Sequence, residues 1–250
     1  MSEERPLSHS HSPAAIRARL QEPVKPNYTG DAVLGSIDGA VTTFAVISGV
    51  AGAGLPAAAA LILGVANLIA DGFSMAVSNY QAVQTDQQEL DQIRTEEERH
   101  VAREPEGERE EIRQIYAAKG FEGELLEQVV EVLTADEEVW VDTMLREEYG
   151  LTLDNRSPTK AAAVTFGAFC LVGAVPLVPY LWGGVEGENL FFWSAVLTGI
   201  AFAVVGFFRG RVFEGNPWKT MAGTLGLGAG ASAIAYGLGA WVESMVNVPL

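Results

Sequence analysis

The sequence is poor in cysteine and, over long stretches, in charge. Its 250 residues include a single cysteine, Cys170, which excludes a disulfide framework within the chain and any metal site built from several thiolates. Cys170 lies in an apolar run, where we expect it to act as a small buried hydrophobe. The polar, acidic N-terminus lacks an apolar core followed by a cleavage site, so we expect no removable signal peptide.

Charged side chains are nearly missing from two long stretches. Residues 32–83 carry only Asp38 and Asp71, and residues 161–208 carry only two glutamates. A helix needs roughly 20 apolar residues to cross a bilayer, and five apolar runs approach that length, at about 32–53, 57–83, 158–182, 190–208 and 218–242. The sequence therefore predicts five transmembrane helices, with a poorly packed soluble core as the less favoured alternative.

The acidic residues are concentrated between the second and third apolar runs. Residues 84–156 hold 22 of the 32 acidic and 8 of the 16 basic residues, a local net charge of −14. Such a field attracts cations and repels nucleic acid, which we exclude as a partner. The helical pattern predicts three or four helices here, one of them with an apolar side formed by Phe121, Leu125, Val129 and Val132.

The predicted fold is an all-α membrane protein of five transmembrane helices, with a three- to four-helix acidic domain inserted between helices 2 and 3. The predicted division is a flexible tail (1–28), transmembrane helices 1 and 2 (29–83), the acidic domain (84–156) and transmembrane helices 3 to 5 (157–250). The sparse apolar positions of the acidic domain suggest that it needs a partner or a ligand to be stable.

The distribution of basic residues predicts the orientation. The connections at 54–55 and 183–188 have no lysine or arginine, and all 16 basic residues lie in the tail, the acidic domain with its exit, and the turn after the fourth span. By the positive-inside rule, the tail and the acidic domain are cytoplasmic and the C-terminus lies outside. We expect the bacterial inner membrane if the protein is prokaryotic and the vacuolar membrane if it is eukaryotic.

One stripe of the second apolar run is polar. Four of its side chains stand four residues apart and so share a helix face: Asn67, Asp71, Met75 and Asn79. An ionisable residue inside a span costs roughly 2.5–3.5 kcal/mol on insertion scales, which favours a functional role for Asp71. A thioether beside carboxylates favours later first-row ions such as Fe²⁺ over Mg²⁺ or Ca²⁺.

The first apolar run carries two further carboxylates, Asp31 and Asp38, seven residues apart on one face. Asp38 favours an ion or proton path. Asp31 fits either that path or a structural role, as a helix N-cap or as a residue at the level of the lipid headgroups. Gly35 and Gly39 let a neighbouring helix approach beside Asp38, and a similar glycine pair, Gly226 and Gly230, occurs in the last run. The predicted transport path is Asp31, Asp38, Asn67, Asp71 and Met75.

Three spacings in the acidic domain suit metal ligands. Each pair faces one direction on its helix, and three helices can converge such pairs on one or more ions. A solvated acidic surface is the alternative for any single pair. The candidate ligands are Glu97 with His100, Glu108 with Glu111, and Met144 with Glu148.

Several motifs resemble the vacuolar iron transporter family of divalent metal/proton antiporters, over about residues 28–245: Asp38-Gly39, Ser74-Met75 with Tyr80, the Glu-rich insert, and Glu-Tyr-Gly-Leu at 148–151. The resemblance implies a five-span homodimer with a cytoplasmic helical metal-binding domain that moves Fe²⁺ or Mn²⁺ out of the cytosol. It implies membrane ligands at Asp38 and Met75, and domain ligands at Glu97, Glu108, Glu111, Met144 and Glu148.

The chain departs from that pattern at three positions. Asn67 stands where the plant members carry a pore carboxylate, with Asp71 one turn later to compensate. His100 stands in place of a domain glutamate, and Leu145 in place of a second methionine. These departures bear on which metal is carried and on how many ions bind.

We therefore expect a secondary transporter, without catalytic residues or a cofactor, that exports Fe²⁺ or Mn²⁺ in exchange for protons. The alternative is a membrane-tethered ferroxidase, because Glu97 and His100 match the Glu-x-x-His spacing of ferritin-like di-iron sites. Those sites use two such motifs and only one is present. A third possibility is a membrane anchor that presents the acidic domain to a basic protein, which leaves Asp38 and Asp71 unexplained.

Overall fold

The computed structural model describes residues 10–22, 25–153, 156–181, 189–213 and 215–246, and all regular elements within these ranges are helical. Among the described residues, five helical segments are long and apolar enough to cross a membrane: α2 (Thr29–Gly52), α3 (Ala57–Arg103), the segment Pro158–Leu181, α9 (Asn189–Val212) and α10 (Pro217–Val246). The third of these consists of α7 (Pro158–Gly173), the short 3₁₀ helix η1 (Val175–Leu177) and α8 (Val178–Leu181). The predicted all-helical class with five candidate spans is confirmed.

The four other helices are short: α1 (Pro13–Gln21), α4 (Pro105–Ala118), α5 (Gly123–Leu133) and α6 (Glu137–Glu147). The helix α1 lies within the segment predicted to be a flexible tail, of which residues 1–9 and 23–24 are outside the described residues. The connection at 183–188, which the orientation argument used, is also outside them.

Local sequence signals explain where the helices begin. Ser157 caps α7 by accepting a hydrogen bond from the Lys160 amide, and Pro158 occupies the first turn, where its missing N–H costs nothing. Asn216 caps α10 in the same way through Oδ1, which accepts from the amides of Trp218 and Lys219. Short local motifs, a capping residue followed by proline, therefore determine where these two helices begin.

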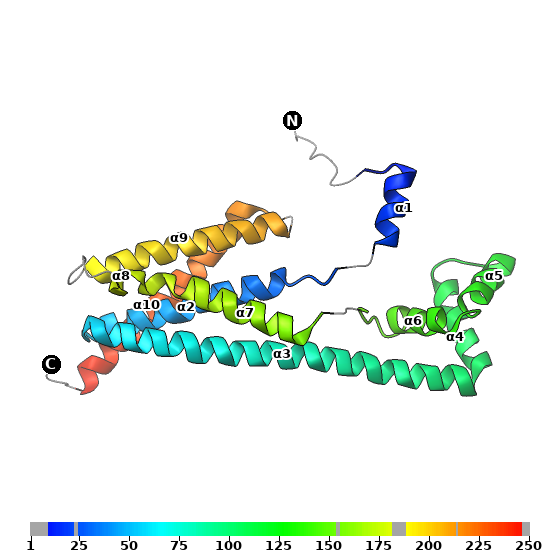
Figure 1. Cartoon of the computed structure of the whole chain (residues 1–250), viewed down its shortest axis with the longest axis horizontal. Coiled ribbons are helices and arrows are strands. Elements are labelled where there is room, and N and C mark those ends of the chain that lie inside the picture. Colours follow the sequence, from blue (N-terminus) through cyan, green and yellow to red (C-terminus); the bar gives the residue numbers. More distant parts are fainter. Residues whose placement is uncertain (1–9, 23–24, 154–155, 182–188, 214, 247–250) are drawn as a thin grey trace.

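The helix α2 lies at the centre of the bundle, in contact with α3, α7, α9 and α10 (Figure 1). It approaches α7 very closely, because a Cβ atom at Gly35 would lie 2.4 Å from the Thr165 carbonyl oxygen, and one at Gly39 would lie 2.4 Å from the Phe169 carbonyl oxygen. The predicted close approach beside Asp38 is confirmed, and α7 is the partner.

The glycine pair of the last span, Gly226 and Gly230, was predicted to let a neighbouring helix approach, but no other described helix of this chain packs against it. Nothing lies within 4 Å of a Cβ built on Gly226 or Gly230. The helix α10 instead places Gly228 against Phe202 of α9, and Gly239 against Gly49 of α2. Many glycines line α10, and their spacing alone does not say which of them faces a neighbour.

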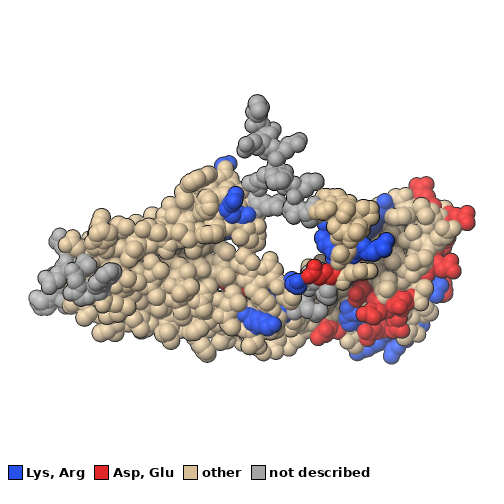
Figure 2. All heavy atoms as spheres, turned by 45° about the horizontal axis from the view of Figure 1, so that its top comes forward, with Lys and Arg blue, Asp and Glu red and all other residues tan. Residues whose placement is uncertain are grey.

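The helix α3 joins the two parts of the molecule. It continues from the bundle without a break to Arg103, where α4 to α6 fold back beside its far end (Figure 1). Figure 2 shows Asp and Glu side chains gathered at that end, whereas the visible surface of the five apolar helices is nearly free of charge. Opposite charges pair within the acidic part, as in Arg94 with Asp142 and Lys119 with Glu147.

The helices α4 to α6 bury a small apolar core formed by Ile112, Leu126, Val130, Trp140 and Met144. The apolar side predicted for α5 is wrong at two positions, because Leu125 and Val132 are exposed whereas Leu126 and Val130 are buried. The other two predicted residues are half-buried, and Phe121 packs against this core. The periodic pattern allowed both faces, and packing against Ile112 and Trp140 selects the second. After α4, Gly120 has a φ of +94°, a conformation that favours glycine, and the chain turns there into α5.

Candidate metal centre and transport path

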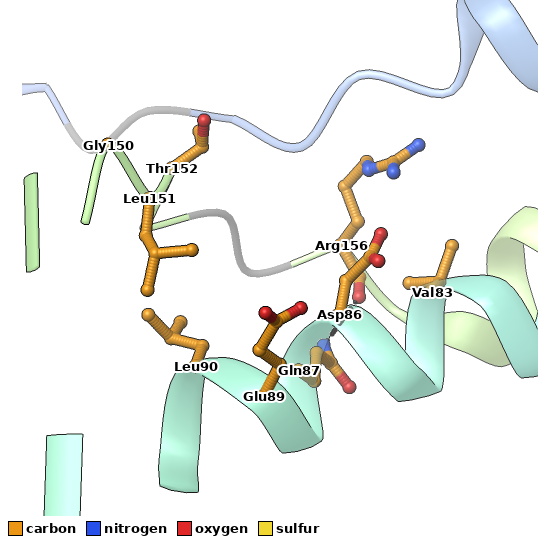
Figure 3. A pocket seen from close by; sticks show the side chains of 9 residues that line it. All are labelled: Val83, Asp86, Gln87, Glu89, Leu90, Gly150, Leu151, Thr152 and Arg156. Carbon is orange, nitrogen blue, oxygen red and sulfur yellow. Dashed lines mark hydrogen bonds between the residues drawn. The ribbon is translucent and has the colours of Figure 1, made fainter. Parts of the chain in front are cut away.

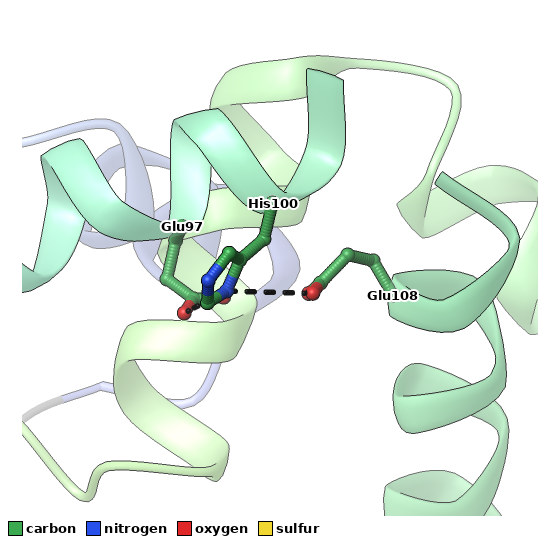
Figure 4. A group of neighbouring side chains, drawn as sticks. All are labelled: Glu97, His100 and Glu108. Carbon is green, nitrogen blue, oxygen red and sulfur yellow. Dashed lines mark ion pairs between the residues drawn. The ribbon is translucent and has the colours of Figure 1, made fainter. Parts of the chain in front are cut away.

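Three of the six predicted domain ligands converge where α3 meets α4. The last turns of α3 carry Glu97 and His100 on one face, and the first turn of α4 carries Glu108 opposite them (Figure 4). Their ligand atoms all lie within 4.8 Å of one another. His100 Nδ1 is 3.3 Å from Glu97 Oε1 and 3.6 Å from Glu108 Oε1. The break at Glu104–Pro105 is what turns the chain back so that α4 faces α3.

The two glutamates of this group are buried although they are acidic. Glu97 is 1% exposed and Glu108 is 5% exposed. Among the described residues, Oε2 of each has no hydrogen-bond partner. A buried carboxylate oxygen without a partner is costly, and a divalent cation bound between the two side chains would remove that cost. This chemistry fits a metal ion held by oxygen and imidazole ligands.

The other three predicted ligands, Glu111, Met144 and Glu148, are not part of this group of converging ligand atoms. Burial, followed by the charges of Glu111 and Glu97, raises the pKa of Glu108 to about 7. Burial and the same two neighbours also raise the pKa of Glu148. Glu111 and Glu148 are exposed but act on the centre electrostatically, whereas Met144 is fully buried in the apolar core of α4 to α6. A role for these three as direct ligands stays a prediction.

Sequence reasoning missed the residue that contacts Glu97 most directly. The Tyr149 hydroxyl donates a hydrogen bond of 3.0 Å to Glu97 Oε1, across from the end of α6 to α3. Tyr149 directly follows Glu148, a predicted ligand, and this adjacency was the available signal. A contact between residues 52 positions apart does not follow from helical spacing.

The polar stripe of α3 borders the face that packs into the bundle. The buried residues Leu68, Gly72 and Ala76 each follow a stripe residue by one position. Asn67 and Met75 are consequently half-buried, and Asp71 is exposed on the single chain. The Asn67 side-chain amide nitrogen is buried and has no partner among the described residues.

Asp38 lines a cavity of about 820 Å³ between α2 and the ends of α9 and α10. The other lining residues are mostly apolar, apart from Arg209 at the last turn of α9. The roles of Asp38 and Asp71 in transport stay predictions.

Asp31 is held by structural contacts. It is 5% exposed, and its Oδ1 accepts a 2.9 Å hydrogen bond from Asn79 Nδ2. Arg156, in the segment that leads into α7, pairs with Oδ2 at 3.6 Å. Tyr28 and not Asp31 is the cap residue of α2, so the helix cap considered for Asp31 is wrong. Its position in the path or at the level of the lipid headgroups stays a prediction. What the structure adds is an anchor between α2, α3 and the entrance to α7.

A second cavity, of about 410 Å³, lies between the acidic part and the bundle (Figure 3). Asp86, Glu89 and Leu90 of α3 line one side, and the segment 150–152 with Arg156 lines the other. Gln87 ties the two sides together by donating a 2.7 Å hydrogen bond to the Arg156 carbonyl. Residues 150–152 and Arg156 thus lie beside α3.

Known proteins resemble this chain over most of its length. The model of the VIT family matches residues 29–240. A vacuolar iron transporter of Toxoplasma gondii is 30% identical over 233 residues, which cover 90% of this chain and 77% of the relative. Vacuolar iron transporter 1 of Eucalyptus grandis is 30% identical over 215 residues, 86% of each chain, and that of Tulipa gesneriana is 29% identical over 232 residues, 90% of this chain and 94% of the relative.

The chain belongs to the VIT family. The resemblance seen in Asp38-Gly39, Ser74-Met75 and the Glu-rich insert is thereby confirmed. VIT family membership and the names of the relatives indicate a membrane transporter and not an enzyme. A ferroxidase is accordingly disfavoured as an account of this VIT family protein.

Proposed function

We propose that this VIT family chain exports Fe²⁺ or Mn²⁺ from the cytoplasm in exchange for protons, and that α4 to α6 gather the ions on the cytoplasmic side. The observation that carries the proposal is the convergence of Glu97, His100 and Glu108, with two buried carboxylate oxygens that lack partners. Deprotonated carboxylates and a neutral imidazole suit a first-row divalent ion. The relatives named as vacuolar iron transporters support iron as the cargo.

The path through the membrane would use the carboxylates of the apolar spans. Asp38 lies in a cavity beside α9 and α10, and Asp71 with Met75 lies on the neighbouring stripe of α3. Asn67, one turn before Asp71, offers an amide oxygen to the same face. A carboxylate that releases a metal can take up a proton, which supports coupling of metal exit to proton entry.

Asp31 stands at the cytoplasmic entrance in this proposal. Its contacts with Asn79 and Arg156 favour a structural role at the mouth of the path over direct contact with the ion. The orientation follows from the basic residues of the tail, the acidic part and the turn before α10, which the positive-inside rule assigns to the cytoplasm.

A homodimer is part of the proposal. Asp71 is exposed on the single chain, at a depth where lipid would otherwise surround it. Facing lipid would cost roughly 2.5–3.5 kcal/mol or more. A second copy packed against this face of α3 would cover Asp71 and place two stripes on either side of one path.

The decisive experiment measures metal uptake into sealed proteoliposomes with the full-length protein. Fe²⁺, Mn²⁺, Co²⁺ and Zn²⁺ are compared, with and without a lumen that is more acidic than the medium. We expect Fe²⁺ or Mn²⁺ to accumulate under the acidic-lumen gradient and the lumen to become more alkaline as it does. Uptake that is equal without the gradient would contradict proton exchange, and no flux of any metal would contradict the transporter.

Two methionine variants test the assigned path. Met75→Ala should lower uptake of the preferred metal severalfold, because the thioether lies beside Asp71 on the stripe. Met245→Ala, at an exposed position near the end of α10, should leave uptake unchanged. Normal transport by Met75→Ala would remove that residue from the path while leaving the rest of the proposal standing.

A further inference from the structure

Tyr149 makes a side-chain contact that the metal chemistry of the centre does not itself require. Its hydroxyl donates to Oε1 of Glu97, the most buried acidic side chain among the described residues, at 3.0 Å. Oε1 also faces His100, whereas Oε2 has no partner. The hydrogen bond therefore occupies one carboxylate oxygen and leaves the other available for an ion.

We propose that Tyr149 is a positioning residue of the metal centre: its hydrogen bond fixes the rotation of the Glu97 carboxylate so that a divalent cation meets Oε2 in one defined geometry. This inference rests on the proposed function, because it assigns Tyr149 to the same ion-gathering site. Hydrogen-bond partners of metal ligands orient those ligands and tune their affinity, and their loss costs roughly 10–100-fold in metal affinity or activity.

The backbone around Tyr149 is arranged to hold the phenol in place. The amide of Tyr149 donates to the Met144 carbonyl at 3.4 Å, and the amide of Leu151 donates to the Leu145 carbonyl at 2.9 Å. Between them, Gly150 has a φ of +66°, in the left-handed region that glycine favours. The end of α6 is thus closed by a glycine turn that points the preceding tyrosine back toward α3.

The hydroxyl group is a donor in this contact. The Tyr149 hydroxyl is the only one of the two groups with a hydrogen to give, because an ionised carboxylate only accepts. Glu97, in contrast, has three side-chain torsions to fix, and ordering such a side chain costs conformational entropy. A hydrogen bond formed before metal arrives reduces the part of that cost which binding must meet.

The experiment compares Co²⁺ binding to detergent-solubilised full-length protein and its Tyr149→Phe variant. Co²⁺ is the probe because its visible absorption reports ligand number and geometry. Tyr149→Phe removes one oxygen atom and should weaken Co²⁺ binding about tenfold. It should also change the absorption of the saturated complex, because Glu97 can then turn and offer both oxygens. Tyr116→Phe is the matched control: Tyr116 packs on Phe121 in the same acidic part, and its variant should keep wild-type affinity and absorption.

A double-mutant cycle shows whether Tyr149 acts through Glu97. In a Glu97→Gln background, Tyr149→Phe should cause little further loss of affinity, because the group it positions is already altered. Equal losses in both backgrounds would overturn the inference, and so would a weakened Tyr149→Phe complex with unchanged absorption. Wild-type protein that binds no Co²⁺ would instead contradict the ion-gathering site of the proposed function. Wild-type binding with an unaffected Tyr149→Phe would overturn the inference alone.

Discussion

Among single residues, Glu108 is the one through which metal binding at the proposed centre would depend on pH. Its pKa is raised to about 7, first by burial and then by the neighbouring carboxylates. At pH 7 about half of the metal-free molecules therefore carry a proton on Glu108, whereas an ordinary glutamate is almost fully ionised. In the proposed centre a metal ion must displace that proton, so a modest acidification around α4 to α6 would favour release of the ion.

We predict that Mn²⁺ binding to the full-length protein weakens as the pH falls from 8 to 6, by about tenfold per unit below the pKa of Glu108 if one proton is displaced. Glu108→Gln should bind Mn²⁺ more weakly at pH 8 and lose most of this pH dependence. Isothermal titration at pH 6, 7 and 8 measures both effects. Glu110→Gln is the control, since Glu110 pairs with Arg113 outside the centre. Equal wild-type affinity at pH 6 and 8 would contradict the prediction.

Asn79 is the residue that ties three helices together at the mouth of the path. Its side-chain nitrogen donates to Asp31 of α2 and to Thr165 of α7. Asn79→Ala leaves both acceptors without this donor, and we expect a loss of about 1–3 kcal/mol in stability.

Thermal unfolding in detergent, with and without Asn79→Ala, measures this loss as a lower midpoint. Asn67→Ala on the same stripe is the control, because the Asn67 side-chain nitrogen has no hydrogen bond to lose among the described residues. A midpoint lowered equally by both variants would show that the links to Asp31 and Thr165 are not what stabilises this region.

At the scale of elements, the approach of α2 to α7 is set by backbone atoms. Gly39→Ala puts a methyl group 2.4 Å from the Phe169 carbonyl oxygen, so the helices must separate. We expect a cost of about 1–3 kcal/mol, as for other overpacked sites, again seen as a lower unfolding midpoint. Gly226→Ala has open space around its Cβ and should keep or raise the midpoint, since alanine favours helix. The opposite ranking would contradict the packing of α2 against α7.

The sequence predicted which segments are helical, but it predicted less well which side of each helix is buried. Ser157-Pro158, Asn216-Pro217 and the apolar runs encode locally where helices begin and how long they are. The register of α5 and the choice between Gly226 and Gly228 depend on which neighbour packs alongside. Hydrophobic periodicity permits more than one buried face on these helices, and contacts with residues distant in the sequence select one of them.

At the candidate metal centre, too, the local spacings were predictable from the sequence and the long-range contacts were not. The spacings of Glu97 with His100 and of Glu108 with Glu111 are local, so the sequence could offer these residues as candidates. The helix break at Pro105 then brings Glu108 opposite α3. The links of Tyr149 to Glu97 and of Asn79 to Asp31 join residues 52 and 48 positions apart. No local pattern encodes these contacts, and only the assembled helices bring them together.

At the scale of the whole molecule, the exposed carboxylate of Asp71 predicts the face through which two copies meet. In a Cys170→Ala background, Asp71→Cys should cross-link to its counterpart with a short bismaleimide reagent in native membranes. Phe73→Cys lies on the other side of the helix and is equally accessible, so it should not cross-link. A cross-linked dimer with Phe73→Cys alone would place the interface on the opposite face of α3.

The unbroken course of α3 has a mechanical consequence. Asp71 and Glu97 stand 26 residues apart on one helix, which is about 39 Å at 1.5 Å per residue. If the helix moves as one straight body, a tilt of about 5° at Asp71 displaces Glu97 by roughly 3 Å. This displacement is larger than the length of a metal–ligand bond. In the proposed transport cycle, a rocking motion of the bundle would therefore be carried along α3 to the proposed metal centre.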